Sequence, residues 1–317
     1  AELCQRVISQ ADELRVRVEG CPSGATLINC GLDGAGGMEA GRAMAEICLA
    51  GLGHVAFTPT HEFAACATSV CVRTDHPISA CMASQYAGWQ ISVGKYFAMA
   101  SGPMRAAAAK ETLFEAVGCT EKPQVAVGVL ETGKLPPPEV CEEIANACGL
   151  TAANVTLLVA PTSSIAGSVQ VVARSVETAL HKMHEIGFDL SLVRSGYGCV
   201  PLPPVAADDL TGIGRTNDAV LYGGRVTLWV ECEDSVVDTY GAKIPSCASS
   251  DFGRPFGEIF AAYDHDFYKV DPHLFSPAQV TIVNLSSEKA ATIGKVRTDV
   301  LAESLGSELG QSRQSYR

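Results

Sequence analysis

Apolar residues along the chain fall into short runs that are typical of buried strands, separated by segments with helical spacing. The β-branched runs at 124–131 and 154–160 predict strands that are buried on both faces. Extended structure is also predicted over 26–33, 54–60 and 69–75 and at the start of 89–102, and a hairpin over 278–296. Helices are predicted over 4–18, 34–53, 77–88, 103–117, 139–149, 254–263 and 299–305.

Three further segments decide the architecture. Ser163 or Ser164 is expected to cap one continuous helix that extends to Gly187. The Pro/Gly-rich segment 196–204 reads as a connector, and residues 219–232 read as a hairpin that turns at Gly223 and Gly224. Strands and helices interleave, but with two hairpins, which favours an α+β (mixed α/β) fold in two lobes over a doubly wound sheet.

The length of the chain also favours two lobes, because 317 residues are more than a single hydrophobic core usually accommodates. Residues 1–306 are expected to form one unit, and residues 307–317 a flexible tail. The lobe boundary is expected near 120–138 or near 196–204, where prolines break the chain. Lobes that are discontinuous in sequence are the alternative.

A charge-free stretch ends in an opposite-charge pair. No Asp, Glu, Lys or Arg occurs between Ile144 and Ala173, and then Arg174 and Glu177 follow three residues apart. On a helix this spacing places both on one face, continued by Gln170 and His181. One interpretation is a solvated stripe with a surface ion pair worth under about 1 kcal/mol. The other is a partly buried carboxylate, held by a guanidinium, that takes a proton from water.

Composition narrows the class of protein. The net charge of −12 argues against a nucleic-acid partner, since phosphate binding needs a basic face. The thirteen cysteines form no framework, and no apolar run reaches the length of a membrane span. These features predict a cytoplasmic protein without a membrane partner.

Other candidate motifs are weak by themselves. Segments 34–42, 99–105 and 211–218 combine small residues with an Arg, and each could present backbone N–H groups to an anionic or polar ligand. Tight turns and helix caps explain any one of them equally well, and no phosphate-binding or dinucleotide fingerprint is present. His181 and His184 form an H-x-x-H, which is a weak metal signal without further ligands, so no metal is expected.

Several long blocks, in order, carry a family resemblance. They are AGGMEAGRAMAEICLAGLG, TDHPISACMASQYAGWQISVGKYFAMASGPMRA, LLVAPTSSIAGSVQVVARSVETALHKM, IGRTNDAVLYGG and DFYKVDPHLFSPAQVTIVN. Together they resemble the methenyltetrahydromethanopterin cyclohydrolases, over about residues 4–306. The resemblance implies two α+β lobes with a large pocket between them, and a homotrimer.

The resemblance also implies a reaction. Members reversibly hydrolyse the methenyl bridge of a reduced pterin carrier to its 5-formyl form, without a metal or other cofactor. The family block ARVVETG reads ARSVETA here, so the active-site pair falls on Arg174 and Glu177. Glu177 is expected to activate water and Arg174 to orient the carboxylate and keep it ionised. The residues expected to line the substrate site are Ser101, Arg105, Arg215, Asn217 and Asp218.

Alternatives stay open at this point. The chain could act on a different pterin or purine amidine, or bind the one-carbon carrier without catalysis. Whether the carrier is phosphorylated, and in which direction the reaction runs, does not follow from the residues.

Overall fold

Two six-stranded mixed sheets form the framework of the protein. The computed structural model describes residues 1–306, apart from the side chain of Tyr268. Sheet A has the strand order β1-β2-β8-β7-β6-β5, in which β2, β8 and β7 are parallel and the other neighbours antiparallel. Its strands are β1 (Arg17–Gly20), β2 (Thr26–Asn29), β5 (Trp89–Val93), β6 (Tyr96–Ser101), β7 (Ala126–Glu131) and β8 (Val155–Ala160).

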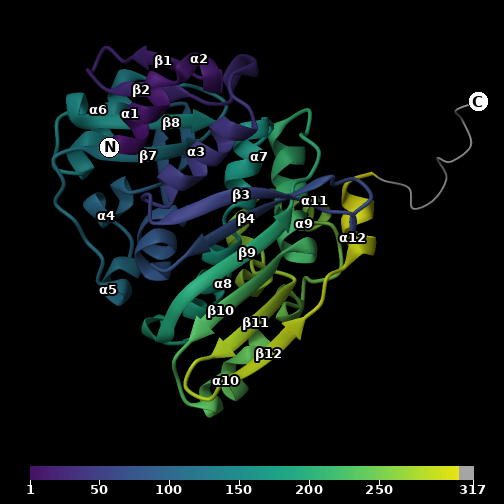
Figure 1. The fold of residues 1–317 in the computed structure, drawn as a ribbon. Helices are drawn as coiled ribbons and strands as arrows, with labels where there is room; N and C mark the ends of the chain where they lie inside the picture. The colour runs from purple at the N-terminus through teal and green to yellow at the C-terminus, as the bar shows by residue number, and fades with distance from the viewer. Residues whose placement is uncertain (307–317) are drawn as a thin grey trace, which may run out of the picture.

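Sheet B has the order β12-β11-β10-β9-β4-β3, and only β10 and β11 are parallel neighbours. Its strands are β3 (Gly53–Pro59), β4 (Thr68–Thr74), β9 (Val193–Pro201), β10 (Arg225–Val230), β11 (Gln279–Asn284) and β12 (Lys289–Gly294). Figure 1 shows sheet A at the upper left and sheet B below it. The predicted α+β class is therefore confirmed.

Helices cover the sheets and the space between them. In chain order they are α1 (Glu2–Ser9), α2 (Ala11–Leu14), α3 (Met38–Cys48), the π-helix η2 (Ile78–Gln85), α4 (Met104–Ala108), α5 (Leu113–Val117), α6 (Pro138–Ala147), α7 (Ile165–Val172), α8 (Ser175–Glu185), α9 (Asp209–Gly223), α10 (Asp234–Tyr240), α11 (Phe256–Ala262) and α12 (Thr298–Ser304). Single 3₁₀ turns are η1 (Leu32–Gly34), η3 (Ala152–Asn154), η4 (Leu190–Leu192), η5 (Gly241–Lys243), η6 (Ser246–Ala248), η7 (Phe267–Lys269) and η8 (Pro272–Leu274). No helix among the described residues is long and apolar enough to cross a membrane.

The strands of each sheet come from two separate parts of the sequence. The proposed boundary near 120–138 lies among the strands of sheet A, and that near 196–204 includes the end of β9 in sheet B. The division into lobes stays a prediction, and the predicted tail at 307–317 lies outside the described residues. Sheet A takes residues 17–29 and 89–160, and sheet B takes residues 53–74 and 193–294.

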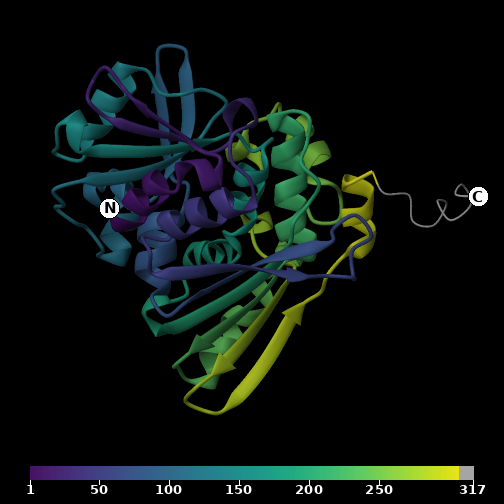
Figure 2. The same ribbon diagram turned by 45° about the horizontal axis from the view of Figure 1, so that its top comes forward.

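Helices α3 and α7 lie side by side between the two sheets (Figures 1 and 2). A Cβ on Gly41 of α3 would lie 2.8 Å from Val169 Cβ and 2.9 Å from Ala166 Cα of α7. The two helix backbones therefore approach closely because both surfaces carry small residues. Close packing against α3 accounts for the small Ala166, and a Cβ on Gly167 would clash with the Pro161 carbonyl.

The predicted continuous helix from 163–164 to 187 is interrupted. Ser164 caps α7 by accepting a hydrogen bond from the Gly167 amide, as predicted, but α7 ends at Val172 and α8 begins at Ser175. Arg174 occupies the N-cap position of α8 with φ −83° and ψ 9°. The break turns the chain, so that Glu177 lies in the first turn of a new helix.

Two sequence predictions about sheet B were wrong. Residues 196–201 are part of β9, at the centre of the sheet, and not a connector. A Cβ on Gly196 or Gly198 would lie 2.5 Å or less from Val176 or Ser175 of α8, so these glycines admit a helix against the strand. Residues 219–223 are the end of α9 rather than a strand; they are buried on every side, which removes the helical periodicity.

Smaller departures have local causes. Residues 17–20 form the edge strand β1 instead of extending the first helix, because Arg15 adopts a left-handed conformation that ends α2. Residues 89–101 form the hairpin β5–β6, and the helix predicted over 103–117 is divided into α4 and α5.

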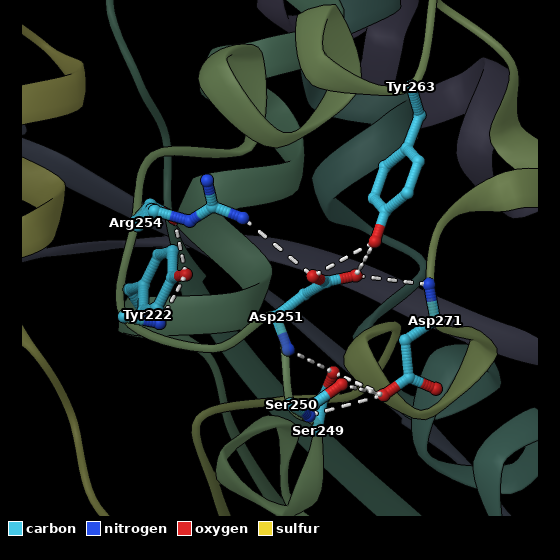
Figure 3. A network of polar contacts seen from close by, with 8 residues as sticks. Tyr222, Ser249, Ser250, Asp251, Arg254, Tyr263 and Asp271 are labelled. Atoms are coloured by element: carbon cyan, nitrogen blue, oxygen red, sulfur yellow. Dashed lines mark hydrogen bonds and ion pairs between the residues drawn. The ribbon is translucent and has the colours of Figure 1, made fainter.

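A network of hydrogen bonds and an ion pair links residues 249–254 to Tyr263, at the end of α11, and to Asp271, just before η8 (Figure 3). The Asp251 carboxylate accepts hydrogen bonds from the Tyr263 hydroxyl at 3.3 Å and the Asp271 amide at 3.2 Å, and lies 3.7 Å from the Arg254 guanidinium. The Asp271 carboxylate in turn accepts a 2.7 Å hydrogen bond from the Ser249 hydroxyl. These carboxylates are satisfied by protein donors, which indicates a structural role.

Candidate active site

The polar face that begins at Gln170 is buried. Arg174 is 7% exposed and Glu177 5% exposed, and Gln170 is buried as well. His181, one turn further along α8, stacks on Tyr86 at 4.5 Å between ring centroids. A solvated stripe is therefore excluded, and the two charges lie where sheet A, α7, α8 and η2 meet.

Arg174 is held by three elements of the fold. Its Nη1 donates to the Gln85 carbonyl at 2.9 Å, and its Nη2 donates to Gln170 Oε1 at 3.0 Å and to Ser101 Oγ at 3.2 Å. The Gln85 amide nitrogen returns a 3.1 Å hydrogen bond to the Ala173 carbonyl. The guanidinium is thus fixed by the end of η2, the end of β6 and α7.

The network continues to the carboxyl ends of the two parallel strands β7 and β8. Gln170 Nε2 donates to Glu131 Oε2 at 3.4 Å, and the Thr162 hydroxyl donates to Glu131 Oε1 at 2.6 Å. Glu131 ends β7, and Thr162 follows β8. Ligand sites commonly lie at this edge of parallel strands, so the position is consistent with a binding site.

These linked residues, Gln85, Ser101, Glu131, Gln170 and Arg174, form the Arg174 cluster, and two of its polar atoms lack a partner. Gln85 Oε1 and Arg174 Nε are buried and accept or donate no hydrogen bond among the described residues. Buried polar groups are normally satisfied, so an unpaired acceptor and an unpaired donor in one polar network are unusual and mark it as a candidate functional site.

Burial raises the pKa of Glu177 from an ordinary value of 4.5 to about 7. The positive charges of Arg174 and Arg105 act in the opposite direction and limit the increase. Among the described residues the carboxylate accepts no hydrogen bond and lies in no ion pair within 4.0 Å. A carboxylate with a pKa near neutrality can exchange a proton with water in both directions.

The expected direct contact between Arg174 and Glu177 is therefore not formed in this structure. The N-cap geometry of Arg174 directs its guanidinium toward Gln85, Gln170 and Ser101 instead. Arg174 therefore acts on Glu177 through its positive charge and not through a hydrogen bond. Water screens this charge only weakly, because both groups are buried.

Arg105 lies close enough to influence Glu177 electrostatically, but its hydrogen bonds go to the protein. It is completely buried, forms a two-pronged ion pair with Glu111, and donates to the Met82 carbonyl at 2.8 Å. Its guanidinium carbon also lies 5.0 Å from the centre of the Tyr86 ring. Arg105 therefore supports the wall of the cluster; direct substrate contact stays a prediction.

Among the described residues, no hydrogen bond or ion pair connects the Arg174 cluster to Arg215, Asn217 or Asp218. All three lie on α9, so the backbone amides of 213–218 are used within the helix and cannot present an anion site as expected. Arg215 donates to the Pro204 and Val205 carbonyls at 3.3 and 3.4 Å.

Asp218 is a buried link between helices. Its Oδ1 accepts a 2.7 Å hydrogen bond from the Phe256 amide of α11, and its Oδ2 accepts from the Ser304 hydroxyl of α12. Burial raises its pKa to about 7. The contacts of Asp218 are structural, and its predicted role in binding stays untested.

Ser101 is the predicted substrate residue that contacts the candidate pair directly, through its hydrogen bond with Arg174. Sequence reasoning placed Gln170 on the polar face of the pair but did not identify Gln85 or Glu131. Glu131 had a usable signal, because it is a carboxylate at the end of a strand that was predicted to be buried. Gln85 had none, since its position depends on the π-helix.

The described part of the chain shows no group of three or more His, Cys, Asp or Glu side chains arranged to hold a metal. A surface hollow of about 680 Å³ lies on sheet B, lined among others by His54, Arg73, Tyr197 and Trp229, and it includes no member of the Arg174 cluster. The large pocket expected between two lobes stays a prediction.

Comparison with known proteins gives the class to which this fold and site belong. The model of a family described as cyclohydrolase (MCH) matches residues 1–305. A methenyltetrahydromethanopterin cyclohydrolase of Xanthobacter autotrophicus is 48% identical over 306 residues, covering 96% of this chain and 91% of that protein. Proteins of the same name from Rhodopirellula baltica and Methanosarcina mazei are 48% and 42% identical, covering 90% and 95% of this chain and 87% and 95% of their own. The chain is a member of the cyclohydrolase (MCH) family, as its sequence blocks predict.

Proposed function

We propose that the protein hydrolyses 5,10-methenyl-tetrahydromethanopterin to 5-formyl-tetrahydromethanopterin, reversibly, in one-carbon metabolism. The observation that carries the mechanism is the buried Glu177, with a pKa of about 7, beside the fixed guanidinium of Arg174. The substrate is inferred from the relatives, because proteins that are 40–48% identical to this chain are named methenyltetrahydromethanopterin cyclohydrolase.

The substrate carbon is bonded to two nitrogens and shares their positive charge, so it is already electrophilic. Glu177 takes a proton from water as the water oxygen bonds to this carbon. The resulting tetrahedral intermediate then loses its hydroxyl proton to solvent, the carbon–N10 bond breaks, and Glu177 returns its proton to N10. One proton is released in total, and acid–base help of this kind contributes about 10²–10⁴-fold.

Arg174 acts in this proposal through its charge. It lowers the pKa of Glu177 against the effect of burial, so that part of the enzyme carries an ionised base at neutral pH. Its contacts with Ser101 and Gln170 keep that charge in place. Arg105 supports the same wall, and Arg215, Asn217 and Asp218 are kept as candidates for binding more distant parts of the substrate.

We further propose that the chain assembles as a homo-oligomer, with the trimer implied by resemblance, and acts in the cytoplasm. All thirteen cysteines are free thiols, which suits a reducing compartment. A light-scattering mass of one chain in solution would contradict the assembly.

The test is the loss of the methenyl absorbance band in the presence of purified protein. The phosphorylated and dephosphorylated carriers are compared, with Glu177→Gln as the catalytic variant. Glu185→Gln is the matched control, because it removes an exposed carboxylate from the same helix. Decay with wild type and Glu185→Gln but not with Glu177→Gln supports the proposal. Equal decay with all three proteins would mean that another group acts as the base. No decay with any of them would favour a different amidine substrate or a carrier-binding protein.

A further inference from the structure

Two cysteines face each other across strands β4 and β9 of sheet B. Cys71 and Cys199 are directly opposite in the antiparallel register, and their sulfur atoms lie 3.0 Å apart. Opposite residues in such a pair have Cα atoms about 4.5–5.5 Å apart, which lies within the range that a disulfide accepts. An S–S bond of about 2.05 Å requires the sulfurs to approach by about 1 Å, without a change of register.

The pair lies on the face of the sheet that α8 does not cover. Side chains alternate along a strand, and Gly198, beside Cys199, faces Ser175 of α8. Two residues along from the cysteines, on their own face, Arg73 and Tyr197 are exposed. Cys199 is partly exposed and Cys71 is 5% exposed, so a small oxidant has to enter the pair from the side of Cys199.

The surroundings give the two thiols different roles. The hydrogen bond with Cys199 lowers the pKa of the Cys71 thiol, and the hydroxyls of Tyr197 and Thr58 act in the same direction against burial. The same hydrogen bond raises the pKa of Cys199. The direction of these shifts makes Cys71 the candidate nucleophile of the pair, because the thiolate is the reactive form.

The other thiols of the chain differ from this pair. Cys21 and Cys141 are also in side-chain hydrogen-bond contact, but both are buried, at 8% and 0% exposed. Burial raises the pKa of several, including Cys30, Cys81 and Cys141, which makes them unreactive. Cys247 is exposed but has no neighbouring thiol in contact.

We propose that Cys71 and Cys199 form a dithiol that hydroperoxides convert into a cross-strand disulfide. The Cys71 sulfur attacks one peroxide oxygen, the O–O bond breaks, and the other oxygen leaves as water after taking a proton. The Cys199 sulfur then attacks the sulfenic sulfur of Cys71, the S–O bond breaks, and the hydroxide takes the Cys199 proton to form a second water. Two thiols and one hydrogen peroxide thus give one disulfide and two waters.

The test uses the full chain and a few equivalents of hydrogen peroxide near pH 7. After denaturation and alkylation, the oxidised protein is expected to carry two fewer alkyl groups than the thirteen of the reduced protein. A non-reducing peptide map should show a Cys71–Cys199 linkage that a reductant removes. The linkage should persist in Cys247→Ser, which removes the exposed thiol elsewhere.

Variants of the pair separate the two roles. In Cys199→Ser the reaction should stop at sulfenic acid on Cys71, which dimedone traps. A map in which Cys247 is oxidised while Cys71 and Cys199 remain alkylated would overturn the proposal, as would a linkage between any other two cysteines. Because the map of the unmodified protein is decisive by itself, the test does not depend on the variants folding.

Discussion

The buried carboxylate of Glu177 makes an unusual prediction: replacing it should stabilise the fold while abolishing turnover. The folded-state pKa is about 7, against an ordinary value of 4.5, because burial penalises the charged form. One pKa unit corresponds to about 1.4 kcal/mol, so ionised Glu177 destabilises the native state by about 3 kcal/mol at alkaline pH. Glu177→Gln removes this cost with almost no change in side-chain volume.

The sign of the effect depends on pH. Below about pH 4.5 the carboxyl is protonated in both folded and unfolded chains, and it contributes no difference. As the pH rises toward about 7, the unfolded chain releases the proton and the folded chain retains it, so the wild type loses stability relative to the variant. Above about pH 7 the difference is complete.

The assay is urea unfolding of wild type, Glu177→Gln and the control Glu185→Gln at pH 5 and pH 8. The gap in unfolding free energy between Glu177→Gln and wild type should widen by about 2–3 kcal/mol between the two pH values, and Glu185→Gln should show no such widening. A variant less stable than wild type at pH 8 would refute the reasoning, because it would mean that Arg174 more than compensates for burial.

Three further outcomes are expected. Arg174→Ala removes the charge that lowers the pKa of Glu177, so the alkaline-rising limb of the pH–rate profile should move to higher pH; an unmoved limb would contradict the electrostatic role. Glu111→Gln leaves the buried Arg105 without its counter-charge and should cost about 3–5 kcal/mol in chemical denaturation, whereas a loss below 1 kcal/mol would mean that solvent reaches Arg105. Gly41→Ala forces apart the backbones of α3 and α7 and should cost about 1–3 kcal/mol; an unchanged melting temperature would show that the helices move freely.

The apolar pattern alone predicted much of the framework. Strands β2, β3, β4, β7, β8, β11 and β12 and helices α3, α6, α11 and α12 follow the runs from which they were inferred. The pattern failed in two places. Gly196 and Gly198 in β9 allow a helix to pack closely and do not form a turn, and the end of α9 is a helix that is buried on every side. In both cases the deciding contact comes from an element distant in the sequence.

The candidate site also depends partly on local sequence and partly on tertiary structure. The sequence by itself determined the candidate pair, because a charge-free stretch ending at Arg174 and Glu177 is local information. Only the tertiary structure decided that both are buried, that Arg174 contacts Ser101, Gln85 and Gln170 rather than Glu177, and that Asp218 links helices elsewhere. The physical reason is that burial and charge partners, which set the pKa of a carboxylate, are supplied by α4, η2, β6 and α7 together, and no local pattern specifies how these elements meet.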